Sequence, residues 1–260
     1  MPLSTKAAGD RQSRPSRKER YRYVYGVIQS RKEQSFGKIG IQDRDVYTVH
    51  YKDLAAVVSD ASKQEYEILD YGTTHQKVVE EVSRAWCIVP MGFGQVTTES
   101  DLKTFLVHHY AALIGMRKKV EGNVELGVKA FWQMDRVLQS LAAQDDGIRI
   151  FQGQISGRPE KETYRLRIRL GQRVASGLEG QRKAISTAMH RKLAKLAVDA
   201  RINKNVTDQM IFNASYLVDL NREQEFDACV EALDAEFGDR VTMNYFRSPA
   251  YSFANLHIRR

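Results

Sequence analysis

The sequence contains no apolar run long enough to cross a membrane. Its longest apolar stretches are short pieces such as residues 54–58, whereas a spanning helix needs about 18 to 20 apolar residues. The first twenty residues, MPLSTKAAGDRQSRPSRKER, are polar and basic and lack the apolar core of a secretory signal. We therefore expect a soluble protein of the cytoplasm that does not act at a membrane.

Cysteine is nearly absent as well. Cys87 and Cys229 are the only two, and each lies in an apolar pattern, AWCIVP and DACVEAL. Free cysteine in such a pattern commonly serves as a small buried hydrophobic residue. We therefore predict no disulfide, which fits a reducing compartment.

Recognisable catalytic and ligand-binding motifs are also missing. Gly37 and Gly40 fit neither a dinucleotide-binding nor a phosphate-binding loop, and no G-x-S-x-G elbow occurs. The six histidines do not pair with Cys, Asp or His at zinc-ligand spacing. His75 near Asp70 is a candidate acid–base pair, but a histidine at the start of a helix more often caps or packs. The sequence thus predicts no enzyme, no cofactor and no metal site.

What the chain does contain is a change at Tyr21 from a polar composition to one rich in aromatic and β-branched residues. Residues 1–20 carry almost no apolar side chains and predict a disordered basic tail. Beyond it, YRYVYGVI, DVYTVHY and LAAVVS have the composition and alternation of strands. The pair Lys52-Asp53 separates the last two and predicts a hairpin turn.

Helical periodicity follows these strands. Apolar residues recur at helical spacing over residues 70–86 and again over residues 100–120. The segment CIVPMGFGQV between them predicts a strand that Pro90 bends or confines to a sheet edge. Residues 21–120 therefore predict an N-terminal α+β domain of ferredoxin-like type.

Residues 121–260 predict a second α+β domain that ends in a C-terminal tail. VELGVKAFW, MIFNASYLVDL and RVTMNYF predict strands, and residues 222–237 predict a helix. Residues 160–203 predict a long helical segment that bends or breaks near Gly180. The expected fold class is α+β with two domains, each a modified ferredoxin-like antiparallel sheet with packed helices, and a long helical segment in the second.

Positive charge is concentrated in that helical segment. Residues 160–204 hold twelve Lys or Arg against four Asp or Glu. Such a stretch suits nucleic acid, an anionic surface or an acidic protein, and it also suits a plain solvated helix face. If it does bind a partner, we expect Arg191, Lys192 and Lys195 to take part.

One segment raises the alternative of a ferredoxin-like RNA-binding module. Residues 92–96, GFGQV, resemble the core of the RNA-recognition consensus. However, Met91 stands where the consensus has a basic residue, and Gln95 and Thr98 stand where it has stacking aromatics. Only one aromatic residue, Phe93, would remain for base stacking, so nucleic acid is the less favoured partner.

Taken in order, several short segments resemble the gas vesicle protein F/L family. Residues 89–94 resemble its P-x-R-F-G segment and residues 124–129 its V-E-x-x-V-K strand. Two places depart from the family pattern, Gly92 in place of a basic residue and residues 246–250 in place of its proline-rich ending. The other matching segments are residues 23–27, 53–59, His75 with Val78, residues 213–218 and residues 249–253.

The resemblance implies a two-domain accessory protein located in the cytoplasm and at the gas vesicle. Such a protein contacts the major shell protein and other accessory proteins while vesicles nucleate and assemble, either transiently or as a minor shell-associated component. For partner binding we single out the basic residues Arg191, Lys192 and Lys195 together with Tyr251 and Phe253 of the tail.

Overall fold

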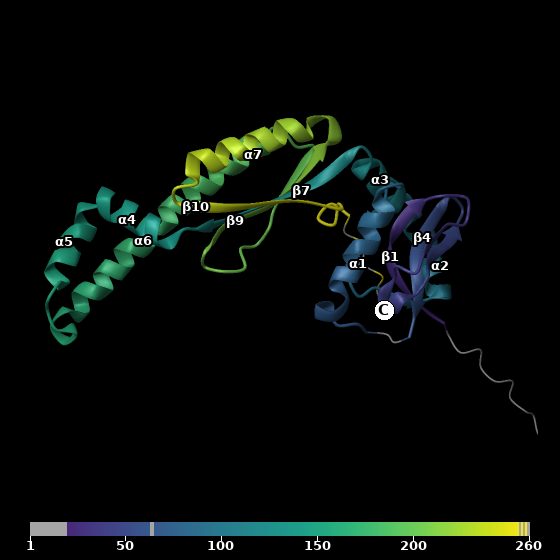
Figure 1. Ribbon diagram of the computed structural model, residues 1–260, viewed down its shortest axis with the longest axis horizontal. Helices are drawn as coiled ribbons and strands as arrows, with labels where there is room; N and C mark the ends of the chain where they lie inside the picture. Colours follow the sequence, from purple (N-terminus) through teal and green to yellow (C-terminus); the bar gives the residue numbers. More distant parts are fainter. Residues whose placement is uncertain (1–19, 63–64, 255, 257, 259–260) are drawn as a thin grey trace, which may run out of the picture.

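The computed structural model describes residues 20–62, 65–254, 256 and 258. The predicted disordered tail at residues 1–20 therefore lies outside the described residues, apart from Arg20. The described chain is elongated, with one sheet near the N-terminus, a second sheet further along and a helical arm at the far end (Figure 1). Helices and two antiparallel sheets confirm the predicted α+β class.

Sheet A has the strand order β2-β3-β4-β1-β5, and β6 also pairs with β1. All of its pairings are antiparallel, and the predicted hairpin is present because Tyr51 at the end of β3 pairs with Leu54 at the start of β4. The strands are β1 (Tyr21–Gln29), β2 (Ser35–Gly37), β3 (Val46–Tyr51), β4 (Leu54–Ala61), β5 (Val89–Pro90) and β6 (Val96–Thr98), with a short 3-10 turn, η1 (Ile41–Asp43), between β2 and β3.

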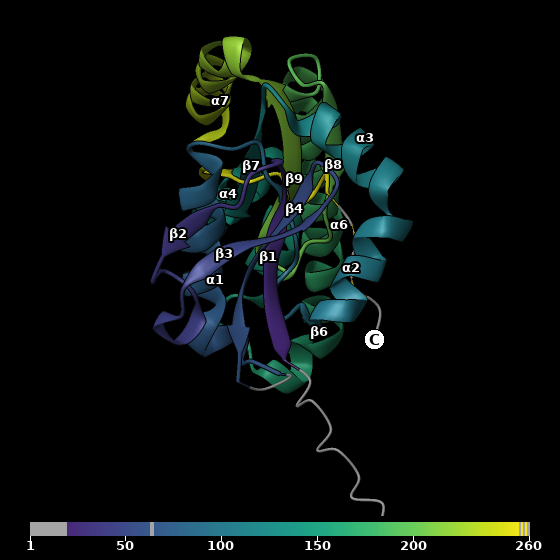
Figure 2. The ribbon, with the colours of Figure 1, turned by 90° about the vertical axis from the view of Figure 1, so that its right-hand side faces the viewer.

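Helices cover both faces of sheet A (Figure 2). Tyr23 and Tyr25 of β1 pack with the helix α1 (Ile68–Ser83), whereas Val24 and Val27 pack on the opposite face. That second face is covered by α2 (Glu99–His108) and α3 (Tyr110–Val120). Because neither face meets solvent, every residue of β1 except its two ends is buried.

The single helix predicted over residues 100–120 is in fact two. The chain leaves helical geometry at His109, whose φ of −102° and ψ of 13° end α2 and begin α3. The apolar period continues across this break because both helices bury residues in one core, Leu102 and Leu106 from α2 and Leu113 from α3. Periodicity alone therefore did not reveal the break.

Sheet B has the strand order β10-β7-β9-β8, again fully antiparallel. Its strands are β7 (Asn123–Trp132), β8 (Asp199–Ile202), β9 (Met210–Asp219) and β10 (Val241–Ser248). The helices α6 (Glu160–Leu193) and α7 (Glu223–Phe237) pack on one face only, and η2 (Leu220–Arg222) leads into α7. The four-residue strand β8 lies in a stretch predicted to be helical, so the prediction of helix up to residue 203 is wrong there.

The far end of the molecule is a helical arm, of which only the long helix was predicted from the sequence. It is formed by α4 (Met134–Gln144), α5 (Asp146–Ile155) and the first half of α6 (Figure 1). α6 runs through Gly180 without a break, so of the two predicted alternatives the break is wrong, and a bend at Gly180 stays a prediction. The uninterrupted helix of 34 residues is about 51 Å long, and it joins the arm to sheet B.

Candidate interaction surfaces

The three basic residues singled out from the sequence lie at the C-terminal end of α6 and just beyond it. Arg191 and Lys195 are exposed, whereas Lys192 Nζ donates to Glu236 Oε2 of α7 at 2.5 Å. Arg191 also borders a surface groove of about 390 Å³, lined by Gly180, Lys183, Ala184, Thr187 and Ala188. Arg191 and Lys195 are therefore the two of the three that are open to a partner.

The C-terminal segment after β10 crosses from sheet B toward the N-terminal half (Figure 1). Glu125 of β7 is buried, and its carboxylate accepts hydrogen bonds from the Ser252 N–H at 2.8 Å and the Ser252 hydroxyl at 2.6 Å. Further along, the Ile258 N–H donates to Gln95 Oε1 at 2.9 Å. The segment is thus fastened to both halves of the molecule.

Tyr251 and Phe253, the tail aromatics singled out from the sequence, pack within the chain. Phe253 is 2% exposed, and Lys119 Nζ and the Arg201 guanidinium carbon each lie 5.5 Å from its ring centroid. The centroids of the Tyr251 and His75 rings are 6.1 Å apart, and burial raises the pKa of the Tyr251 phenol. In this conformation both side chains hold the tail in place, and their direct part in partner binding stays a prediction.

His75, the candidate acid–base residue, is a buried packing residue. The Tyr23 hydroxyl accepts from the Gly94 N–H at 3.0 Å and lies 3.0 Å from His75 Nδ1. His75 Nε2 lies 3.1 Å from the Met91 carbonyl oxygen, which only accepts, so Nε2 carries the ring proton. Burial lowers the pKa of His75 to about 4. The ring is therefore neutral, and both of its nitrogens are occupied.

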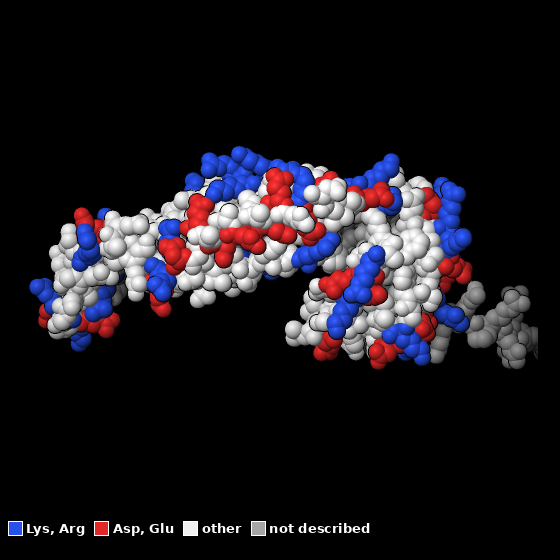
Figure 3. Space-filling model, turned by 45° about the horizontal axis from the view of Figure 1, so that its top comes forward, with Lys and Arg blue, Asp and Glu red and all other residues white. Residues whose placement is uncertain are grey.

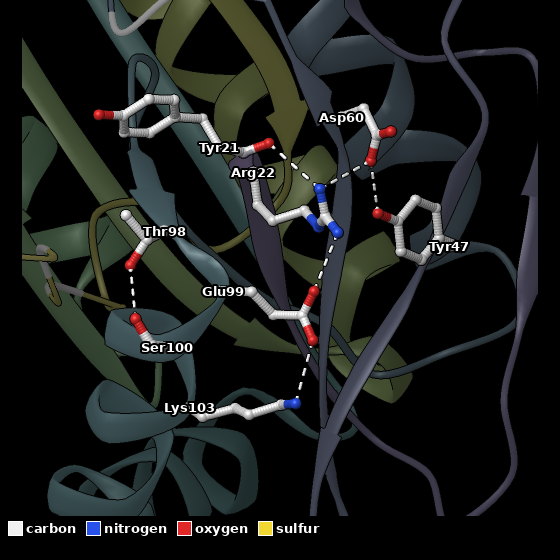
Figure 4. Close-up of polar contacts among 8 residues, drawn as sticks. All are labelled: Tyr21, Arg22, Tyr47, Asp60, Thr98, Glu99, Ser100 and Lys103. Atoms are coloured by element: carbon white, nitrogen blue, oxygen red, sulfur yellow. Dashed lines mark hydrogen bonds and ion pairs between the residues drawn. The ribbon is translucent and has the colours of Figure 1, made fainter. Parts of the chain in front are cut away.

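Arg22 of β1 is a second buried polar residue, and its two terminal guanidinium nitrogens have partners, whereas its buried Nε has none among the described residues. Its guanidinium pairs with Asp60 at 3.0 Å and with Glu99 at 2.9 Å (Figure 4). Tyr47 donates to Asp60, and Lys103 donates to Glu99. The hydrogen bond from Lys103 is the main cause that lowers the pKa of Glu99. This cluster joins the start of α2 to sheet A and provides structural pairing rather than a reactive group.

The segment that resembles an RNA-recognition motif forms a turn between β5 and β6. The Phe93 ring centroid lies 6.1 Å from that of Tyr23 and 5.8 Å from that of His75. Gly94 has a φ of +83°, in the left-handed region that favours glycine. An RNA platform instead presents aromatic side chains on a sheet surface for base stacking. Phe93 is therefore a half-buried residue that packs against Tyr23 and His75 in a turn, not a side chain displayed on a sheet surface.

Two further sets of side chains bear on possible chemistry, the potential metal ligands and the two cysteines. No group of three His, Cys, Asp or Glu within the described ranges could hold a metal ion. Burial raises the pKa of both cysteine thiols, which keeps Cys87 and Cys229 protonated. A cleft of about 680 Å³ between the two halves is lined by charges of both signs, among them Glu80, Arg84 and Arg247.

None of the helices in the described part of the chain combines the length and apolar composition that a membrane span requires.

The basic α6 has an acidic counterpart in α7, which was not among the predicted binding features. α7 carries six Asp or Glu and no Lys or Arg from Glu223 to Phe237. Figure 3 shows a row of acidic residues along this side of the C-terminal half, with basic residues beside it. The run EQEFDACVEALDAEF, with six acidic and no basic residues, is the sequence signal for this acidic helix.

Comparison with known proteins agrees with this architecture. Residues 21–255 match the family model of the gas vesicle synthesis protein GvpL/GvpF. Gas vesicle protein F of Dolichospermum flosaquae is 25% identical over 90% of this chain and 97% of its own length. Gas vesicle protein F1 of Halobacterium salinarum is 29% identical over 91% of this chain and 93% of its own length.

Solved structures give the same result. The crystal structure of GvpF from Microcystis aeruginosa is 26% identical and superposes with a TM-score of 0.73, covering 91% of this chain and 99% of that one. GvpF from Anabaena sp. PCC7120 shares the fold, with a TM-score of 0.77 over 92% of this chain and 99% of that one. The family match spans both sheets, the helical arm and most of the tail, so the chain belongs to the GvpL/GvpF family of gas vesicle synthesis proteins.

Proposed function

We propose that this protein is a non-enzymatic accessory protein that binds the major gas vesicle shell protein and other accessory proteins while the vesicle nucleates and assembles. The observation that carries the proposal is the family match, which covers the chain from the first strand of sheet A to the tail. Relatives named gas vesicle protein F align over nearly their whole length. The proposed location is the cytoplasm, at the growing vesicle or its shell.

The physical task is the handling of apolar protein surface before a shell has formed. A subunit that exposes apolar faces or strand edges aggregates unless a partner covers them. This chain offers an exposed cationic end of α6 and an extended sheet, both of which suit protein contacts. Within the proposal, Arg191 and Lys195 contact a partner directly, and Lys192 does so if it leaves Glu236.

Tyr251 and Phe253 keep an indirect place in the proposal. Because Phe253 is buried and Tyr251 packs near His75, they position the tail between the two halves. A partner that contacts the tail would then meet a surface that these two aromatics hold in shape.

The test is capture of the coexpressed major shell protein by the tagged full-length chain. The double variant Arg191→Glu and Lys195→Glu should weaken capture, because two exposed cations are reversed. The double variant Lys32→Glu and Lys38→Glu changes the net charge equally at exposed positions of the N-terminal half and should capture normally. No capture by the unaltered chain would refute the proposal, and equal capture by both variants would remove the α6 surface from it.

A further inference from the structure

The outer edge of sheet B at β10 is long and regular. β10 pairs with β7 over all eight residues without a register shift, and within the described chain it has no strand on its other side. The Gln133 N–H donates to the Arg240 carbonyl at 2.8 Å, which sets the alternation of the antiparallel ladder. By this alternation Met243, Tyr245 and Arg247 direct their N–H and C=O groups away from β7.

The opposite edge of the same sheet is protected. β8 has only four residues, and the Ala200 N–H is taken by the Asp199 carboxylate at 2.8 Å. Just beyond the strand, the Asn213 side chain donates to the Lys204 carbonyl at 2.9 Å. Short edges and occupied backbone groups are common means of preventing unwanted strand pairing. β10 has neither, so its outward backbone groups are the ones ready to accept another strand.

A stripe of carboxylates runs beside the open edge. Glu223, Asp227, Glu231 and Asp234 fall on one side of α7 at helical spacing. The first two mark that side as the one over β10, because Glu223 pairs with Arg247 and Asp227 accepts from the Tyr245 hydroxyl. Glu231 and Asp234 are not ion-paired with any residue in the described ranges. A strand placed against β10 would therefore pass beneath unpaired negative charge.

The other face of β10 adds apolar surface. The Phe246 ring lies directly over Gly127 of β7, where any side chain would collide with it, and Lys129 Nζ lies 5.1 Å from its centroid. Phe246 is nevertheless 41% exposed. An added strand would cover its free side and so bury apolar area that the chain alone leaves open.

A second copy of this chain is a poor occupant. If two β10 strands paired around a two-fold axis, the two α7 helices would lie on the same face of the joined sheet. Each brings six carboxylates and no Lys or Arg, so like charges would face each other across the axis. The same charge favours a segment of a different protein that carries Lys or Arg on its α7 side.

We propose that the β10 edge binds an extended segment of another polypeptide by strand addition, with Lys or Arg toward the α7 carboxylates and apolar side chains toward Phe246. This inference rests on the proposed function, and the polypeptide is the major shell protein. Main-chain hydrogen bonds would supply affinity, and the alternation of side chains would supply specificity.

The first experiment is amide hydrogen exchange of the full-length chain, alone and in complex with the coexpressed shell protein. We expect the amides of Met243, Tyr245 and Arg247 to exchange rapidly in the free chain and at least about tenfold more slowly in the complex. The amides of Thr242 and Asn244, which point to β7, serve as internal controls that are protected in both states. Capture without new protection at the three outward amides would overturn the inference while leaving the proposed function intact. No capture at all would remove the proposed function, and the inference with it.

Two matched pairs of variants separate backbone from charge. Arg247→Pro removes one outward N–H, whereas Arg247→Ala removes the same side chain and keeps that N–H. Capture of the shell protein by Arg247→Pro should therefore be about tenfold weaker than capture by Arg247→Ala. Glu231→Lys with Asp234→Lys should weaken capture, and Glu33→Lys with Asp45→Lys, at exposed sites in the N-terminal half, should not. Equal capture by Arg247→Pro and Arg247→Ala, or unchanged capture by the α7 variant, would overturn strand addition at this edge.

Discussion

The two sheets of this molecule are covered in different ways. Sheet A lies between α1 on one face and α2 with α3 on the other, and its central strand is buried along almost its whole length. Sheet B has helices on one face only, and part of its other face is covered by the C-terminal tail. In β10 most residues are exposed. Sheet A is thus completed by its own helices, whereas sheet B leaves one face for the tail and an exposed edge strand.

The largest expected effect concerns the tail as a covering layer of sheet B. If the tail packs as firmly as the helices that cover sheet A, Phe253→Ala should lower the free energy of unfolding by about 3–5 kcal/mol, because removing a large buried ring leaves a cavity. Urea unfolding followed by circular dichroism measures this change in the free energy of unfolding. Phe246→Ala, at a ring that is 41% exposed, is the control and should lose much less. A loss below about 1 kcal/mol for Phe253→Ala would show that the tail is only loosely attached.

Acid should act on sheet A through His75. Burial lowers the pKa of this residue in the folded chain to about 4, so between about pH 6.5 and pH 4 the unfolded chain binds a proton that the folded chain does not. The contribution is complete above about pH 6.5 and is lost as the pH falls toward 4. We expect a loss of about 2 kcal/mol from pH 8 to pH 5, measured by urea unfolding at several pH values.

The matched variant for this prediction is His75→Gln, which keeps a polar side chain in the buried position and cannot titrate. It should be less stable than the unaltered chain at pH 8 and should lose less stability on acidification. A pH dependence equal to that of the unaltered chain would assign the acid effect to other groups.

A smaller effect is expected where the tail is joined to sheet B. Ser252→Ala removes the hydroxyl that donates to the buried Glu125 carboxylate and keeps the N–H that also donates to it. A buried acceptor that loses one partner destabilises the fold by about 1–3 kcal/mol. Ser252→Cys, which retains a weak donor of similar shape, should recover part of this loss. If thermal unfolding shows no change in Ser252→Ala, this contact does not hold the tail.

The smallest effect is expected at the start of one covering helix of sheet A. Thr98 Oγ1 accepts from the Asp101 N–H at 3.2 Å and caps α2. Thr98→Ala should destabilise the chain by about 1 kcal/mol in urea unfolding, and Thr98→Ser should be nearly neutral because it keeps the capping oxygen. Equal losses in both variants would point to the lost methyl group rather than the cap.

Local pattern predicted most of the regular elements. The alternation in YRYVYGVI and VELGVKAFW gave β1 and β7, and helical spacing gave α1 and α7, because their apolar faces were already periodic in the sequence. Two features could not be predicted from local pattern. The break at His109 leaves the apolar periodicity intact, and the strand β8 has only four residues. Of the residues singled out for binding, Arg191 and Lys195 lie exposed, as a charged stretch predicts.

By itself, the sequence determined the α+β class, the main strands and helices and, through short ordered motifs, the family resemblance. These depend on contacts between near neighbours in the chain and on residue types, which are printed in the sequence. Only the tertiary structure decided that Phe253 is buried, that Ser252 meets Glu125, and that β10 is an open edge beside a stripe of carboxylates. Each depends on which distant segments meet, and local spacing carries no record of that.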